Sequence, residues 1–513
     1  MRLRRHENAT FSCRLSFRSG SRVMSGVRRA LAFSIGERYV MLVIALASNM
    51  AIARLLTPEA IGIYSVSMAI VGVAQVLRDF GVASYLIQEK DLKDEYIQAA
   101  FGILLVLGVG VAIVLLFAAP YIGALYGEPR MIPTLRVCAL NFLLIPFCTV
   151  SLAILRRNMQ FKRLAAVNLA ATAAGAIATT GLAFLGYGVI SLAIGSVLLN
   201  AVTGIGAWIV REDRRILMPA FAEWRRVINF GAQSSVSGIV TSLAMDTNDL
   251  VVGKLMGFGP VAILSRAQGL MNLFHRDMMA AIRNVAYPAY AQAHRDNQAL
   301  EPVYITSVTN VTAVAWPFYG FLALYSHEIL RLMFGPQWDA AAPLVPIFCL
   351  AGAIAAISSL ASSVILAVRR IDLVTKVELS FQPLRAAMIV AAALIFQTTM
   401  ACALALAISL LIQLPMVYYA KGRCIANDYR ALFFGLGQSA KVTLACLIVP
   451  SVIAFYTRGS RDTAIGWFAF ACAALVCVAC WAAALVAVRH PLASEPIFQK
   501  MRNAGRLRKT TGT

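Results

Sequence analysis

The chain has 513 residues, of which 60% are hydrophobic and only 14% charged, and its mean hydropathy is +0.74. This composition excludes an ordinary soluble domain. The net charge of +22 suggests an anionic partner, but the cations are dispersed over many short segments and form no single basic face. We therefore expect no nucleic acid, and expect the anionic headgroups of membrane lipids as partners.

Long apolar stretches follow one another along the chain, each long enough to cross the ~30 Å hydrocarbon slab at about 1.5 Å per residue. The sequence predicts an all-α polytopic membrane protein with about 14 transmembrane helices. The stretches cover roughly residues 31–53, 60–86, 97–119, 131–155, 164–184, 188–210, 227–252, 260–283, 303–325, 341–367, 374–396, 400–420, 438–456 and 464–488.

The distribution of Lys and Arg indicates the orientation of these helices in the membrane. Most of the 46 Lys and Arg residues lie in the two tails and in every second gap between stretches. Cytosolic loops carry such an excess, so both termini are expected in the cytosol. The opposite gaps contain only Arg54, Arg130, Lys254, Arg331, Arg458 and Arg461.

The two halves of the chain share a faint internal repeat. Arg54-Leu55, Ile63 and Ser65 recur 200 positions later as Lys254-Leu255, Ile263 and Ser265, and an Arg-Asp pair follows in each half. We expect two pseudo-symmetric six-helix lobes with a cavity between them. The predicted parts are a basic, disordered cytosolic tail (1–30), an N-terminal lobe (31–210), a linker (211–226), a C-terminal lobe (227–420), two accessory helices (438–488) and a basic tail (489–513). An alternative for the first part is that translation begins at Met24.

No cofactor, metal site or disulfide framework is predicted. Most of the ten cysteines lie in or beside apolar stretches, where Cys acts as a small hydrophobic residue. Cys477 and Cys480 form a C-x-x-C pattern inside the last stretch, without further ligands near them in the sequence.

Several arginines lie inside the predicted helices. A charge at the centre of a membrane helix costs about 2.5–3.5 kcal/mol, so these groups must face protein or water. Guanidinium groups bind phosphate in a bidentate manner, and we interpret these arginines as a binding site for a diphosphate. They are Arg38, Arg78, Arg276, Arg266 and Arg385.

Ion pairing inside the protein is a competing explanation, because carboxylates lie near these arginines in the sequence. Neighbours such as Arg78 and Asp79 point about 100° apart on a helix, so each is expected to need its own partner. The carboxylates that can neutralise the arginines are Glu37, Asp79, Asp246, Asp249, Asp277 and Glu378. Of these, Asp79, Asp246, Asp249 and Asp277 are also candidates for coupling transport to a proton or cation.

Between roughly residues 35 and 425 the chain contains a series of short motifs. They are Arg54-Leu-Leu-Thr-Pro-Glu-Ala-Ile-Gly62, Arg78-Asp-Phe-Gly81, Leu86-Ile-Gln88, Tyr126-Gly-Glu-Pro129, Leu155-Arg-Arg157, Phe161-Lys-Arg163, Asp249-Leu-Val-Val-Gly253 and Gly335-Pro-Gln-Trp338. In order and spacing the chain resembles the O-antigen and exopolysaccharide flippases of the multidrug/oligosaccharidyl-lipid/polysaccharide exporter superfamily.

The resemblance implies two lobes in a V shape around a central cationic cavity. It also implies movement of undecaprenyl-diphosphate-linked oligosaccharide from the inner to the outer leaflet of the bacterial inner membrane. The biological setting would be exopolysaccharide or lipopolysaccharide biosynthesis, with polysaccharide polymerase or export machinery as further expected partners. Arg38 and Arg266 would lie near places that luminal arginines occupy in flippases of peptidoglycan precursors.

Two other functions stay open. A drug or organic-cation exporter of the same fold needs acidic and aromatic cavity residues, whereas the buried charges here are mainly Arg. A polytopic enzyme such as a polysaccharide polymerase needs a larger extramembrane loop with catalytic side chains, but the outer gaps are short and the five His residues do not cluster. We therefore expect a flippase that is not an enzyme.

Overall fold

The computed structural model describes residues 39–79, 82, 86, 93–211, 219, 248–459 and 467–494, and its regular elements there are all helical, as predicted. The chain forms two compact units, Met1–Ile239 (unit 1) and Val240–Thr513 (unit 2). The described helices of unit 1 are Tyr39–Leu55, α2 (Pro58–Asp79), α4 (Asp94–Tyr126), α5 (Met131–Arg157), α6 (Phe161–Phe184) and α7 (Ile190–Val210).

Unit 2 contains more and shorter elements. They are a helix over residues 248–255, α9 (Phe258–Asn272), the π-helical turn η1 (Leu273–Met278), α10 (Met279–Arg295), α11 (Leu300–Leu324), α12 (Ser326–Phe334), the 3-10 helix η2 (Pro336–Leu344), α13 (Val345–Ser358), α14 (Ala361–Ala367), α15 (Ile371–Phe396), α16 (Thr399–Gly422), α17 (Tyr429–Gly459), α18 (Trp467–Ala487) and η3 (Pro491–Ser494).

Large apolar side chains cover the outer faces of these helices. Phe117 on α4 is 73% exposed, Phe455 on α17 is 78% exposed and Leu475 on α18 is 72% exposed. Patches of this kind are rare on soluble proteins and suit contact with lipid. Within the described residues, nine helices are long and apolar enough to cross a membrane. The number 14 and the lobe boundaries stay predictions.

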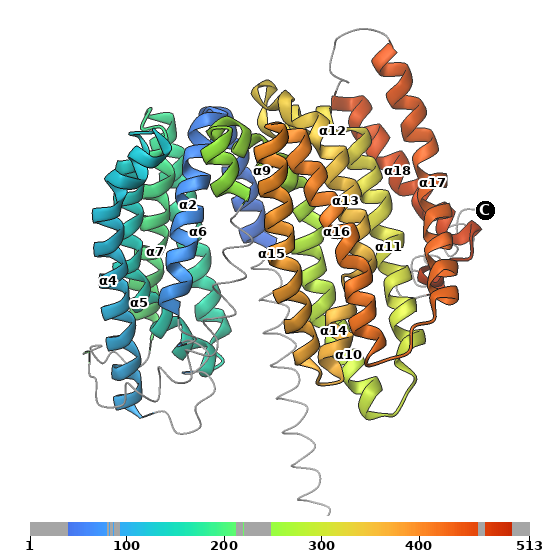
Figure 1. The fold of residues 1–513 in the computed structure, drawn as a ribbon, viewed down its shortest axis with the longest axis horizontal. Helices are drawn as coiled ribbons and strands as arrows, with labels where there is room; N and C mark the ends of the chain where they lie inside the picture. Colours follow the sequence, from blue (N-terminus) through green and yellow to red (C-terminus); the bar gives the residue numbers. More distant parts are fainter. Residues whose placement is uncertain are drawn as a thin grey trace, which may run out of the picture. The chain divides into compact units, whose positions relative to one another are not determined.

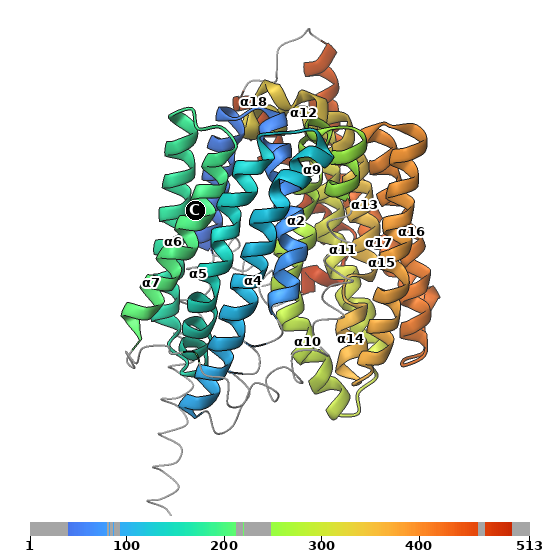
Figure 2. The same ribbon diagram turned by 60° about the vertical axis from the view of Figure 1, so that its left-hand side comes forward.

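Unit 1 is built from helical hairpins. Short loops join α4 to α5 and α6 to α7, and in each hairpin the two helices pack along each other (Figures 1 and 2). Helix α5 also packs against α7 and α2, so it lies at the centre of this unit. Its Phe147 meets Phe101 of α4 edge to face, with ring centroids 5.1 Å apart.

Helices α6 and α7 approach each other closely because small residues face each other at the contact. A Cβ added at Gly195 would lie 1.7 Å from Oγ1 of Thr179 and 3.2 Å from the carbonyl oxygen of Gly175. Small residues permit such close approach between membrane helices. Since the backbone of α6 lies on one side, a side chain at Gly195 has no space to occupy.

In unit 2, α11 lies between α13 and α17 (Figure 1). Thr312 of α11 donates a hydrogen bond of 2.9 Å to Ser439 of α17, and the hydroxyl of Tyr325 donates one of 2.8 Å to the carbonyl of Pro450. The indole of Trp481 on α18 donates to the carbonyl of Ala313 at 2.8 Å. The last two helices are therefore bonded to the rest of unit 2.

A third attachment lies at the start of α11. Glu301 forms an ion pair with Lys421, the fully buried cation at the end of α16, and accepts the backbone N–H of Asp428 at 3.1 Å. The ammonium group of Lys421 lies 4.5 Å from the ring centroid of Tyr304. A buried ammonium needs such partners, and Glu301 supplies the counter-charge.

One predicted helix is divided. The stretch 341–367 begins in η2, continues as α13 and is interrupted at Ser359 and Leu360 before α14. Pro336, Pro343 and Pro346 lack the backbone N–H that an α-helix uses, which favours the 3-10 start. The hydroxyl of Ser359 donates to the carbonyl of Ala356 at 2.8 Å, which competes with the helix ladder at the interruption.

The internal repeat falls at corresponding structural positions. Arg54 and Leu55 end the helix before α2, and Lys254 and Leu255 end the helix before α9. A short turn follows in each case, and in unit 2 it contains Gly257 with φ +89°.

We expect Gly195→Val to destabilise unit 1. Overpacking at a tight contact costs about 1–3 kcal/mol, because the added methyl groups collide with Thr179 and the backbone of Gly175. Thermal unfolding of the purified protein should show a transition several degrees lower. Gly181→Val on α6, where a Cβ meets nothing within 4 Å, is the control. Equal shifts in both variants would show that the α6–α7 contact is not tight.

Candidate functional site

Part of the predicted site lies outside the described residues. Arg38 and Asp246 belong to that part. Arg78 and Asp79 end α2, but their side chains lie outside it as well. Their predicted roles therefore stay predictions.

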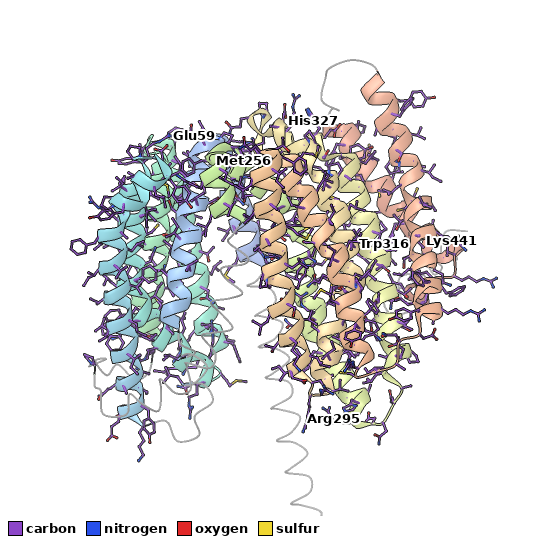
Figure 3. The ribbon with its side chains drawn as sticks, viewed as in Figure 1. Glu59, Met256, Arg295, Trp316, His327 and Lys441 are labelled. Atoms are coloured by element: carbon purple, nitrogen blue, oxygen red, sulfur yellow. The ribbon has the colours of Figure 1, made fainter. Side chains whose placement is uncertain are left out.

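The remaining charged residues centre on one long helix formed by α9, η1 and α10. Arg266 lies on α9, about 12 Å from its start, and Arg276 follows about 15 Å further along on η1. In unit 2 the turn before α9, near Met256, and the end of α10 at Arg295 lie at opposite ends (Figure 3). The two guanidinium groups are thus held at different depths of one helix.

The centre of this helix is widened. Residues 273–278 form a π-helical turn that contains His275, Arg276 and Asp277. Single π-turns inside α-helices are uncommon and often lie at functional sites. Sequence reasoning missed this turn, since no residue pattern distinguishes a π-turn from an α-helix. It also passed over Asn272 and Arg283, which lie one turn before and two turns after Arg276 on the same helix.

Arg276 is exposed in spite of its central position. Its side chain is 74% exposed, and its Nε donates to Oδ1 of Asp277 at 3.1 Å. The expectation that adjacent Arg and Asp residues need separate partners is wrong for this pair. The long arginine side chain bends back on its neighbour, and the widened turn brings successive side chains to a smaller angle than in an α-helix.

Arg266 has a different environment, formed by two aromatic rings. Its guanidinium carbon lies 4.8 Å from the ring centroid of Phe334, the last residue of α12, and 4.8 Å from that of Trp338 in η2. Trp338 is fully buried. Stacking of this kind stabilises a cation by about 0.5–2 kcal/mol and holds its plane in place.

Arg385 and Asp249 lie on other elements. Arg385 is half-buried in the middle of α15, where Glu378 accepts a hydrogen bond of 2.7 Å from Gln382. Asp249 is half-buried in the helix before α9. Among the predicted site residues, the structure joins Arg276 to Asp277.

A second charged group lies where the loops of unit 1 meet. Arg130, between α4 and α5, donates from Nε to Oε1 of Glu128 at 2.8 Å and from Nη2 to Oε1 of Glu59 at 2.9 Å. These hydrogen bonds hold the pKa of the Glu128 carboxyl below its ordinary value. In the sequence, Arg130 had served only to indicate orientation.

The α9–η1–α10 helix is suited to binding an anion, since it holds guanidinium groups at different depths. Within the described residues there is no cluster of His, Cys, Asp and Glu that could hold a metal ion.

Comparison with known proteins identifies the family. The sequence pattern of a family described as polysaccharide biosynthesis protein matches residues 51–343, more than half of the chain. The chain belongs to this family. The resemblance inferred from the motifs is therefore confirmed at the level of the family.

Curated members of comparable sequence have names from polysaccharide synthesis. The lipopolysaccharide biosynthesis protein WzxC of Escherichia coli (strain K12) is 22% identical over 327 residues, 63% of this chain and 66% of its own length. The succinoglycan biosynthesis transport protein ExoT of Rhizobium meliloti (strain 1021) is 23% identical over 300 residues, 58% of this chain and 60% of its own length. Each match spans less than two thirds of the relative.

Solved structures share the fold. The lipid II flippase MurJ in an inward closed conformation superposes with a TM-score of 0.71 at 15% identity, over 90% of this chain and 99% of its own. An inward-facing MATE transporter of the MOP superfamily gives 0.59 at 17% identity, over 78% and 94%. Together with the apolar helices, these matches show that this family member is an integral membrane protein.

We expect Arg266→Lys to destabilise the protein more than Arg276→Lys. Lysine keeps the charge but loses the planar guanidinium that lies over the rings of Phe334 and Trp338, at a cost of about 0.5–2 kcal/mol. Arg276 is mostly exposed and serves as the matched control on the same helix. Thermal unfolding in detergent measures the difference, and equal shifts would contradict the stacking argument.

Proposed function

We propose that this protein moves a lipid-linked oligosaccharide across the bacterial inner membrane by alternating access, without enzymatic chemistry. The substrate would be an oligosaccharide attached to undecaprenyl diphosphate, and it would pass from the cytosolic to the periplasmic leaflet. Both termini would lie in the cytosol, as the distribution of cations indicates. About 14 helices would form the two lobes.

The family and the fold support this proposal. ExoT is named a transport protein for succinoglycan biosynthesis, and MurJ is named a flippase of lipid II. A lipid-linked substrate has a charged head, a hydrophilic glycan and an apolar tail. A carrier for it must offer cations and water to the head while the tail stays in lipid.

The exposure of Arg276 carries the proposal. Its side chain is 74% exposed on unit 2, in the cytosolic half of the stretch 260–283 predicted to cross the membrane. Hydrocarbon around such a group costs about 2.5–3.5 kcal/mol or more, so the exposed face must meet water. We infer that this face of the α9–η1–α10 helix lines an aqueous path.

Asp277 acts in this scheme as an internal counter-ion for Arg276. In the absence of substrate it holds the guanidinium at 3.1 Å, and a diphosphate with more negative charge displaces it. Protonation of Asp277 would release Arg276 for the substrate, which is how this residue would couple transport to protons. Arg38, Arg78, Arg266 and Arg385 would contact the diphosphate at other stages, and Asp79, Asp246 and Asp249 stay candidates for ion coupling.

A cysteine placed at position 276 should react with membrane-impermeant thiol reagents. The water that this position requires would admit the reagent in inverted vesicles, in a background with the native cysteines replaced. Ile448→Cys on α17 is the matched control, because this residue is 62% exposed but apolar and should face lipid. An equal lack of labelling at both positions would contradict an aqueous path along η1.

Direct transport can be measured with proteoliposomes that contain a fluorescent undecaprenyl-diphosphate-linked oligosaccharide. We expect the wild-type protein to equilibrate the lipid between leaflets, and Arg276→Gln to slow this roughly tenfold or more, because a charge-assisted hydrogen bond contributes about 1.5–3 kcal/mol.

The control for this assay is Arg156→Gln, which makes the same change of charge at an exposed position at the end of α5. Its rate should equal that of the wild type. Exchange by the wild-type protein no faster than in protein-free liposomes would falsify the proposed function.

A further inference from the structure

A pocket of about 380 Å³ lies in unit 1 where three loops meet. Its walls come from the turn before α2, the start of α5 and the loop between α6 and α7. Its size is within the range of about 300–1,000 Å³ that small-molecule sites occupy. The main lining residues are Leu55, Thr57, Arg130, Pro133, Tyr187 and Ile190.

The pocket combines one aromatic ring with a fixed set of polar groups. Tyr187 is 56% exposed, and it stands between Gly186 and Gly188, whose φ angles are +86° and +60°. Such positive φ angles favour glycine, so the two residues fix the loop that carries the ring. The N–H of Tyr187 donates to the carbonyl of Leu182 at 3.1 Å, which ties the loop to the end of α6.

Arg130, which also lines the pocket, is held by Glu59 and Glu128. Its Nε and Nη2 make these bonds, so Nη1 keeps its hydrogens for a ligand. The Glu59 side chain is 56% exposed and binds Arg130 through Oε1, so the carboxylate can also accept hydrogen bonds from a ligand.

The charge of this group argues against an anionic ligand. Glu59 and Glu128 both bond the guanidinium of Arg130, so its positive charge is already neutralised there. A phosphate would meet repulsion there, although Arg130 alone would attract it. A neutral polyol avoids that repulsion, and its hydroxyls both donate to carboxylates and accept from a guanidinium.

We propose that this pocket binds a neutral hexose residue of a glycan. The C–H face of the sugar ring would stack on Tyr187, while its hydroxyls would bond Arg130 and Glu59. This inference deepens the proposed function, on which the choice of a glycan as ligand rests. It assigns the sugar to unit 1 and the diphosphate to the arginines described above.

Saturation-transfer NMR on the full-length protein in lipid nanodiscs, free of sugar detergents, tests the proposal. The probes are D-glucose, D-galactose, D-glucuronate and inorganic phosphate. We expect at least one neutral hexose to bind and to be displaced neither by glucuronate nor by phosphate. Tyr187→Ala should weaken that binding roughly three- to tenfold through loss of the stacked ring.

Two variants make the test specific. Tyr121→Ala on α4 is the matched control, because this tyrosine is 78% exposed in the same unit but does not line the pocket. It should leave hexose binding unchanged. Glu59→Gln removes one negative charge and should strengthen glucuronate binding relative to the wild type.

Equal hexose binding by the Tyr187→Ala and Tyr121→Ala variants, or displacement of the hexose by phosphate, would overturn the proposal. Binding and transport are measured separately, so their failures are distinguishable. If hexose binding depends on Tyr187 but no lipid is flipped, the pocket stands and the transport function fails. If lipid is flipped but hexose binding does not depend on Tyr187, only the proposed sugar site is contradicted.

Discussion

A guanidinium group inside a membrane must find aromatic faces, a carboxylate or water, because hydrocarbon offers none of these. The long helix of unit 2 shows two of these solutions in close succession. Arg266 is enclosed by Phe334 and Trp338, whereas Arg276 is exposed and holds Asp277. The aromatic contacts hold the Arg266 guanidinium in place, whereas most of the Arg276 side chain is open to its surroundings. This difference in environment is the basis for assigning function to Arg276.

Hydrophobic length and charge distribution made the fold class predictable. The stretches 131–155 and 164–184 correspond to α5 and α6 within a few residues, because a membrane helix must be both apolar and of a set length. Irregular elements were not predictable in this way. The turn η1 and the division of the stretch 341–367 depend on backbone hydrogen bonding and proline placement, to which hydropathy is insensitive.

Site prediction was limited for a different reason. Depth along a helix follows from counting residues, so the sequence could place Arg266 and Arg276 at different levels. It could not tell which of them is stacked, because Phe334 and Trp338 are far away in the chain and meet Arg266 only through the packing of unit 2. Nor could it predict that Arg130 meets Glu59 of the first turn of α2 and lines one pocket with Tyr187 of the α6–α7 loop.

The bonding of α17 along α11 has a mechanical consequence. Attachments at Glu301, Thr312 and Tyr325 are spread over nearly the whole length of α11, so neither helix can pivot or slide against the other without breaking several bonds together. A displacement at one end of α17 would therefore move α11 with it, and the two helices would behave as one rigid body. Although the last two helices were expected to be accessory, they would take part in any rearrangement that displaces the core of unit 2.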